Sequence, residues 1–190
     1  EDVEFSACFS LRNPFPVSKN EKGKEGDISF ACLKHAGVSE TDVAYGDLTI
    51  ATDAKCACTQ EYWYRGGWCD GISVYWRELT EQDRLRPRSY EEAGAHDHCA
   101  MMAAETLRPG EKSDLRFVLS WNVPNNYNSR NPFQDENGKD IIWKNYYATM
   151  FETSVSSAVY ALSEWDRLFD QTDAYRKAMF ESTLDDAVID

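Results

Sequence analysis

The stretch HCAMMAAETLRPGEKSDLRFVLSW, residues 98–121, contains two apolar segments joined by a polar turn. The turn includes Pro-Gly at 109–110, a pair that is typical of tight turns. We therefore expect residues 99–107 and 115–121 to form an antiparallel hairpin, and short strands linked by turns favour a β-sandwich. In the second segment large apolar residues occupy every second position, as in a half-buried strand: Leu115, Phe117, Leu119 and Trp121.

Shorter segments toward the N-terminus repeat this alternation and predict further strands. Residues 17–27, VSKNEKGKEGD, interrupt them; they are charged and contain glycine, so we expect a surface loop there. The predicted fold class is mostly β with α: an antiparallel β-sandwich followed by C-terminal helices. The alternating apolar residues are Val3, Phe5, Ala7, Phe9 and Leu11, then Ile28, Phe30 and Cys32, then Leu48 and Ile50.

The segment EYWYRGGWCDGISVYWREL, residues 61–79, changes from the strand period to the helix period. The glycines at 66–67 allow a sharp turn between a strand at 58–64 and this helix. Its apolar residues share one helical face: Trp68, Ile72, Tyr75, Trp76 and Leu79.

Large aromatic residues on such faces normally belong to the core. We therefore expect Trp68, Trp76 and Trp121 to be buried. Trp63 and Arg65 are expected to be the more exposed members of the 61–79 segment.

Residues 122–140 are rich in Asn and Pro and show no periodicity, which predicts a long connection. Beyond it the period is helical, with Thr153 or Ser154 placed to cap the first helix. We expect DQTD at 170–173 to interrupt the helical region before a second helix containing Leu184. The apolar face of the first helix consists of Val155, Ala158, Val159, Leu162, Trp165, Leu168 and Phe169.

The domain organisation that follows has three parts. Residues 1–121 form part of an N-terminal β-sandwich domain, residues 122–141 connect, and residues 142–190 are the first helices of a helical domain. The chain opens within a predicted strand and ends without a residue that stops its last helix. We therefore expect it to be a piece of a longer protein.

The net charge of −13 excludes most nucleic-acid partners, because the acidic surface repels phosphates and no Lys/Arg cluster opposes it. No apolar run is long enough to predict a membrane span. The six cysteines are irregularly spaced, and a chain of 190 residues can build a core without disulfides. We expect reduced thiols and a cytoplasmic protein.

Cysteine and histidine residues form one arrangement that resembles a zinc site. The spacing matches no common zinc motif, and buried cysteines with surface histidines account for the same residues, so we predict no metal and no cofactor. No nucleophile elbow or phosphate-binding loop is present, and 33 acidic residues are too many to nominate a catalytic pair. The cysteine and histidine residues of the zinc-like arrangement are Cys56, Cys58, His96, His98 and Cys99.

Aromatic side chains are the remaining candidates for binding, since an exposed ring can stack on the apolar face of a sugar. Trp63, Tyr127 and Trp143 lie near predicted loops. We nominate these three as substrate-binding residues for a carbohydrate.

Three motifs, in this order and spacing, resemble the N-terminal region of glycoside hydrolase family 116, which includes non-lysosomal glucosylceramidases and bacterial β-glucosidases. They are YWYRGGWCDGISVYWREL, LRPGEKSDLRFVLSWNVPNNYN and WKNYYATMFETSVSSAVYAL. The resemblance covers residues 43–190 and implies a β-sandwich docked on an α/α toroid that holds the active site. Near its end the chain is more similar to the bacterial members, which makes a glucosylceramide substrate doubtful.

The resemblance further implies a retaining β-glycosidase with one carboxylate as nucleophile and one as acid/base, both beyond residue 190. We therefore assign no catalytic residue here. The expected partners are a β-glucoside substrate and the downstream helical domain. The alternative is a stand-alone, non-catalytic carbohydrate-binding sandwich; a metal-stabilised interaction domain is a third option.

Overall fold

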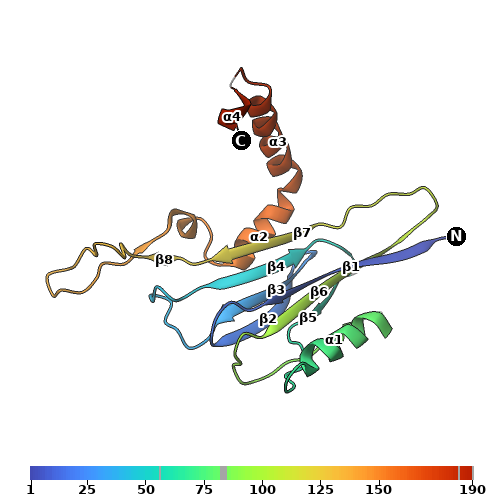
Figure 1. Cartoon of the computed structure of the whole chain (residues 1–190), viewed down its shortest axis with the longest axis horizontal. Helices are drawn as coiled ribbons and strands as arrows, with labels where there is room; N and C mark the ends of the chain where they lie inside the picture. The colour runs from blue at the N-terminus through green and yellow to red at the C-terminus, as the bar shows by residue number, and fades with distance from the viewer. Residues whose placement is uncertain (56, 82–84, 184, 190) are drawn as a thin grey trace.

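The computed structural model describes residues 1–55, 57–81, 85–183 and 185–189. Two antiparallel sheets face each other, with strand orders β1-β6-β5 and β2-β3-β4-β7 (Figure 1). The prediction of a mostly β fold with C-terminal helices is confirmed. The strands are β1 (Val3–Arg12), β2 (Ser18–Glu25), β3 (Ile28–His35), β4 (Asp47–Thr52), β5 (Ala57–Gln60), β6 (His98–Leu107), β7 (Phe117–Asn122), β8 (Asn125–Asn126) and β9 (Trp143–Lys144). The helices are α1 (Asp70–Glu81), the 3₁₀ helix η1 (Tyr146–Thr149), α2 (Ser154–Ser163), α3 (Trp165–Phe180) and α4 (Asp186–Ile189).

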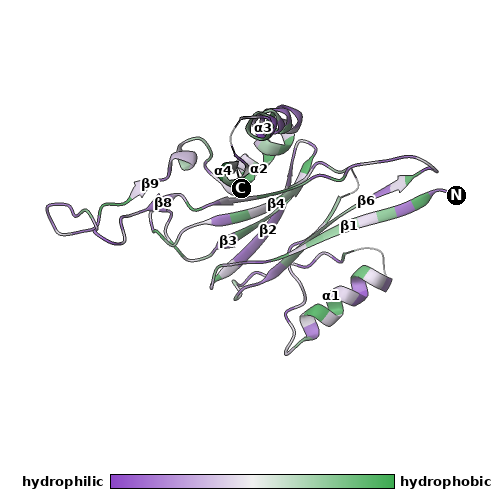
Figure 2. Ribbon diagram, turned by 45° about the horizontal axis from the view of Figure 1, so that its top comes forward, coloured by the Kyte–Doolittle hydropathy of each residue, from purple (hydrophilic) through white to green (hydrophobic). Residues whose placement is uncertain are grey.

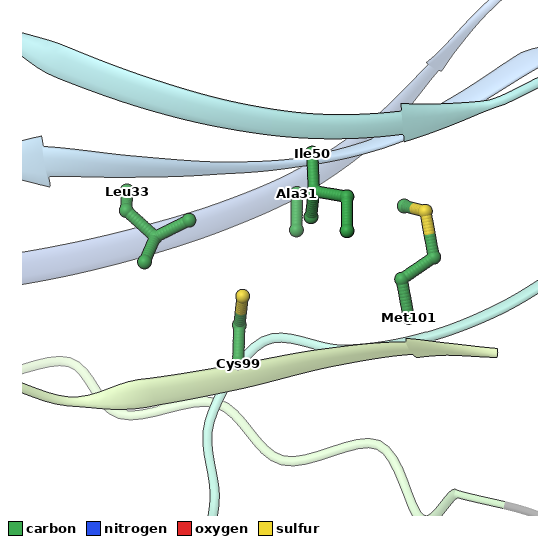
Figure 3. Close-up of a cluster of buried hydrophobic side chains, with 5 residues drawn as sticks. All are labelled: Ala31, Leu33, Ile50, Cys99 and Met101. Carbon is green, nitrogen blue, oxygen red and sulfur yellow. The ribbon is translucent and has the colours of Figure 1, made fainter. Parts of the chain in front are cut away.

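The core between the sheets is built from alternate residues of facing strands. Ala31, Leu33 and Ile50 come from the four-stranded sheet, and Cys99 and Met101 come from β6 of the other (Figure 3). All five are at most 2% exposed. Because successive strand residues point to opposite faces, the same strands also present an outer face to the helices.

A helix covers the outer face of each sheet. On the four-stranded sheet, Ala158 and Leu162 of α2 pack against Ile28 and Ala51. On the other side, α1 lies against the three-stranded sheet (Figure 2), and its Tyr75 belongs to a buried cluster with Ala100 and Met102 of β6. The result is a sandwich with one helix on each side.

The expected hairpin of residues 99–107 and 115–121 is wrong. Strand β6 pairs with β1 and β5, whereas β7 pairs with β4 in the opposite sheet. The connection between β6 and β7 therefore crosses from one sheet to the other. Turn residues at 109–110 are compatible with either path, because a turn fixes local direction and leaves the pairing partner open.

The expected loop at 17–27 is also wrong, since most of it forms strand β2 at the edge of the larger sheet. Its buried side chains are polar: Ser18 is 0% and Asn20 is 2% exposed. Tyr62 provides hydrogen-bond partners for the backbone at this edge. Its hydroxyl accepts a hydrogen bond from the Asn20 N–H (2.8 Å) and donates one to the Asn20 carbonyl (3.0 Å). A single hydroxyl thus satisfies both backbone groups of an edge residue.

Replacing Tyr62 by phenylalanine should therefore destabilise the protein by about 1–3 kcal/mol, because both Asn20 groups lose a buried partner. Urea unfolding followed by circular dichroism measures the change. The exposed Tyr64, changed to phenylalanine, is the matched control and should leave the midpoint unchanged. Equal midpoints for the two variants would contradict this account of the β2 edge.

Helix α1 forms where the sequence predicts it, but its buried face differs. Trp68 is 95% and Trp76 is 61% exposed, and Trp121 on β7 is 62% exposed, so the expectation that all three lie in the core is wrong. Of the predicted face, Tyr75 and Leu79 do pack against the sheet, and the carboxylate of Glu78, which was not predicted there, is buried beside them. The face that packs is the one that can hydrogen-bond to the sheet as well as fill space.

The C-terminal helices differ from the prediction in where they break. Thr153 caps α2 in a capping box with Ser156, as expected. The interruption lies at Glu164, between α2 and α3, and α3 runs without a break through 170–173. Leu184, expected in the second helix, lies outside the described residues.

Candidate functional site

Trp63 lies in a stack of three rings beside α1. Its indole is 4.2 Å from the ring of Tyr75 and 4.6 Å from that of His98, with interplanar angles of 14° and 20°. Its backbone N–H donates to the His98 carbonyl at 2.9 Å. Both faces of the indole are therefore covered, and a sugar cannot stack on Trp63 face to face in this arrangement.

An ion pair fixes the loops next to this stack. Arg65 donates from Nε and Nη2 to the two carboxylate oxygens of Asp97, each at 2.8 Å. Ser18 Oγ donates to the same carboxylate at 2.7 Å, and Asp97 is 8% exposed. Arg65 is half-buried, which corrects the expectation that it is one of the more exposed residues of its segment.

The guanidinium of Arg65 also contacts two tyrosine rings, which pack against each other edge to face. Its central carbon lies 4.2 Å from the ring centroid of Tyr90 and 5.0 Å from that of Tyr62. A methyl group at Gly94 would lie 2.2 Å from Asp97 Oδ2 and 2.6 Å from Arg65 Nη2. The ion pair needs glycine there, and the bonds of Arg65 make it a structural residue.

Beside the stack lies an open cleft of about 670 Å³. Trp68 and His96, which both line it, have the positive φ angles of 55° and 53°, a conformation that bulky residues rarely adopt. Burial, followed by the nearby Arg12 charge, holds the pKa of His98 below its usual value. The cleft thus combines an exposed indole, a neutral imidazole and a cation, a surface suited to hydroxyl-rich or anionic ligands.

The cysteines and histidines do not form a metal site in the part of the chain that the structure describes. Burial raises the pKa of the Cys99 thiol to about 12. His96 Nδ1 lies 3.3 Å from the Asn13 carbonyl oxygen. Cys56, the first residue of the expected Cys56–Cys58 pair, is outside the described residues.

Tyr127 and Trp143 lie far along the chain from the cleft, in a segment that we call the apolar arm, residues 123–146. The arm projects beyond the sheets (Figure 1), whereas the cleft is lined by residues at the start of α1. Within the arm, β8 and β9 pair Asn126 with Trp143, so Tyr127 is the next residue along the chain after the partner of Trp143. Tyr127 is 36% and Trp143 is 40% exposed.

Hydrogen bonds fasten the base of the arm to the sandwich. Asn125 Nδ2 donates to the carbonyl oxygens of Glu40 and Asp42, at 2.8 and 2.7 Å. The Tyr147 hydroxyl accepts from the Val123 N–H (2.9 Å) and donates to its carbonyl (2.6 Å). The arm is therefore held at a defined position although it lies outside the core.

The arm exposes more apolar surface than residues 127 and 143 alone. The other apolar residues of the arm were not predicted as a binding surface, because Asn and Pro dominate the composition of the segment. The available signal was the apolar run at 141–143 within a polar stretch. The exposed large apolar residues of the arm are Val123, Tyr127, Phe133, Ile141, Ile142, Trp143 and Tyr146.

Comparison with known protein families decides between the possible identities of this fold. The family described as "beta-glucosidase 2, glycosyl-hydrolase family 116 N-term" matches residues 1–168. The chain belongs to glycoside hydrolase family 116. A search of curated proteins found no match.

Membership of family 116 confirms the resemblance carried by the three motifs. It identifies these residues as the N-terminal region of a glycoside hydrolase. Among the described residues, no helix is both long and apolar enough to cross a membrane.

Proposed function

We propose that these residues are the supporting module of a retaining β-glycosidase that hydrolyses β-glucosides. In this proposal the sandwich, residues 1–121, carries the connection at 122–141 and the helices at 142–190. The apolar arm and α3 dock on a helical catalytic domain and position it. The observation that carries the proposal is the exposed apolar surface of the arm.

Helix α3 supports the same proposal. Helix α2 is already covered, since Ala158 and Leu162 are buried against the sheet. In contrast, α3 buries none of its residues, and Phe169, Tyr175 and Phe180 are 60%, 68% and 64% exposed. A soluble domain rarely leaves so much apolar surface uncovered without a partner.

The buried carboxylates of the described chain are engaged in structural bonds. Asp47 Oδ1 accepts from the Ser154 N–H at 2.7 Å, Glu78 binds Arg88, and Asp97 binds Arg65. A retaining glycosidase needs two carboxylates about 5–5.5 Å apart that both face the substrate. We therefore place the nucleophile and the acid/base in the helical domain, with no metal or organic cofactor.

We expect residues 1–190 alone to leave an aryl β-glucoside unhydrolysed. In the intact enzyme, Trp143→Lys should lower kcat/KM by at least about tenfold, because a charge replaces an aromatic anchor of the interface. The matched control is Trp68→Lys, which changes an exposed tryptophan away from the arm. NMR of the first product formed reports whether the anomeric configuration is retained.

Turnover by residues 1–190 alone, abolished by one substitution within them, would contradict this proposal. So would equal kcat/KM values for the two lysine variants.

A carbohydrate-binding sandwich is the second candidate, favoured by the cleft and by the 95% exposure of Trp68 beside it. It requires soluble glucans to quench tryptophan fluorescence, and Trp68→Ala to abolish the quenching. The supporting-module proposal requires neither result. We further propose a cytoplasmic location, supported by the free state of the five cysteines in the described residues.

A further inference from the structure

The two long sides of the sandwich are unequal. On the side of β2 and β5, Tyr62 bonds the β2 edge and Ser18 pairs with Gly94, so the sheets are linked. On the side of β1 and β7, the smaller sheet ends one strand short of the larger one: three strands face four. The sandwich is therefore closed on one side and open on the other.

Strand β1 offers a free backbone edge on the open side. All ten of its residues pair with β6, and no second strand pairs with it among the described residues. Its length of ten residues and its lack of proline make it a good template for another strand. Only an extended polypeptide presents a matching row of donors and acceptors that can hydrogen-bond to all of the unpaired N–H and C=O groups along this edge.

An apolar strip of the larger sheet lies next to this edge. Leu119 and Trp121 on β7 pair with Ile50 and Leu48, which face the core between the sheets. Directly paired residues share a face, so Leu119 and Trp121 also point toward the smaller sheet. They are nevertheless 49% and 62% exposed.

Phe9 marks the point at which the cover of this strip ends. Its ring lies 4.8 Å from that of Phe117, at the start of β7, but Phe9 itself is 48% exposed. Beyond it, the exposure of Leu119 and Trp121 shows that the smaller sheet does not cover the inner face of β7.

We propose that the open side binds an extended peptide segment as a fourth strand of the smaller sheet, beside β1 and over Leu119 and Trp121. Its inward side chains would be apolar at alternate positions to cover the strip. A basic residue at one of its ends would complement Glu1, Asp2 and Glu4 at the start of β1, whereas Arg12 lies at the other end of the strand.

A second copy of the chain does not fit the open side through β1. Pairing β1 with β1 would bring the two β7 strands into the same space, because each larger sheet extends one strand beyond its β1. Neighbouring strands are only about 4.8 Å apart, which leaves no room for two extra strands. The geometry therefore accepts one strand.

The test uses residues 1–190 and a fluorescein-labelled synthetic peptide of alternating valine and threonine, as long as β1, with lysine only at the end that would lie beside Glu1, Asp2 and Glu4. Fluorescence anisotropy should give saturable 1:1 binding, and hydrogen exchange of the β1 amides should slow when the peptide is bound. Trp121→Lys should weaken binding by about tenfold or more, because a large apolar contact is lost. Trp76→Lys, an equally exposed tryptophan on α1, is the control and should bind normally.

Three results would overturn the proposal. The first is the absence of saturable binding. The second is equal binding of a peptide with proline at every second position, which cannot form a strand. The third is a dimer in sedimentation experiments that Phe9→Lys dissociates, since that would assign the open side to a second copy.

Discussion

Replacing Asp97 by alanine is expected to lower the free energy of unfolding by about 3–5 kcal/mol, the range for removing one partner of a buried ion pair. Asp97 binds two nitrogens of Arg65 and the hydroxyl of Ser18. Its loss leaves the guanidinium without its anion beside the rings of Tyr62 and Tyr90. It also releases the start of β2 from the loop that leads into β6.

Urea unfolding compares this variant with Asp53→Ala. Asp53 is the matched control because its ion pair with Arg116 is long, 3.9 Å, and both side chains are 35% exposed. Surface pairs of this kind contribute about 0–1 kcal/mol. If Asp97→Ala costs no more than Asp53→Ala, the ion pair does not fix the fold as described.

Replacing Glu78 by alanine should have a similarly large effect, again about 3–5 kcal/mol. Glu78 is 2% exposed on the inner face of α1. It accepts hydrogen bonds from both terminal nitrogens of Arg88 and from Gln60 Nε2 at 2.9 Å. Glu81→Ala, on the exposed side of the same helix, is the control and should change stability little.

The Glu78 interaction also predicts a pH dependence. Burial opposes the charge, but the bonds from Arg88 and Gln60 outweigh it and hold the pKa of Glu78 below its usual value. Below about pH 4.3 the unfolded state binds this proton more readily than the folded state. The stabilisation is therefore complete above that pH and is lost as the pH falls toward the lower pKa of the folded state.

Unfolding of the wild type and of Glu78→Gln, measured from pH 7 to pH 3, isolates this contribution. The difference in stability between the two proteins should be constant down to about pH 5 and should shrink below it. A difference that grows as the pH falls would contradict the assigned direction of the pKa shift.

The strand faces could be predicted from the sequence, but the strand partners could not. Alternation is a property of each segment, and it placed Leu11, Leu48 and Ile50 at positions that the structure buries or packs against the core. Pairing depends on residues far apart in the chain, so the turn at 109–110 led to a false hairpin. Strand β2 escaped detection because its buried side chains are polar and depend on a distant tyrosine hydroxyl.

The exposed tryptophans explain the main error in the predicted core. A helical face of Trp68, Ile72 and Trp76 has the pattern of a buried face, and periodicity alone cannot tell which molecule will cover it. Similarly, Trp121 occupies an inward position on β7 that the smaller sheet does not cover. The sequence pattern therefore predicts burial for side chains that no part of the described chain covers.

Of the three candidate binding residues, Tyr127 and Trp143 both lie on the apolar arm and Trp63 lies apart, in the ring stack. The spacing of Tyr127 and Trp143 in the sequence gave no sign that they share the arm, because this depends on the pairing of β8 with β9. The cleft beside α1 could not be predicted either, since it joins a strand end, a helix start and the loop at 94–97.

Hydrogen–deuterium exchange tests most directly whether the arm and α3 meet a catalytic domain. Residues 1–190 and the intact enzyme would be compared peptide by peptide at the same pH and temperature. We predict much slower exchange in the intact enzyme for the arm, residues 123–146, and for Trp165–Phe180, with little change in strands β3 and β6. Equal exchange in both proteins across the arm and α3 would contradict the account.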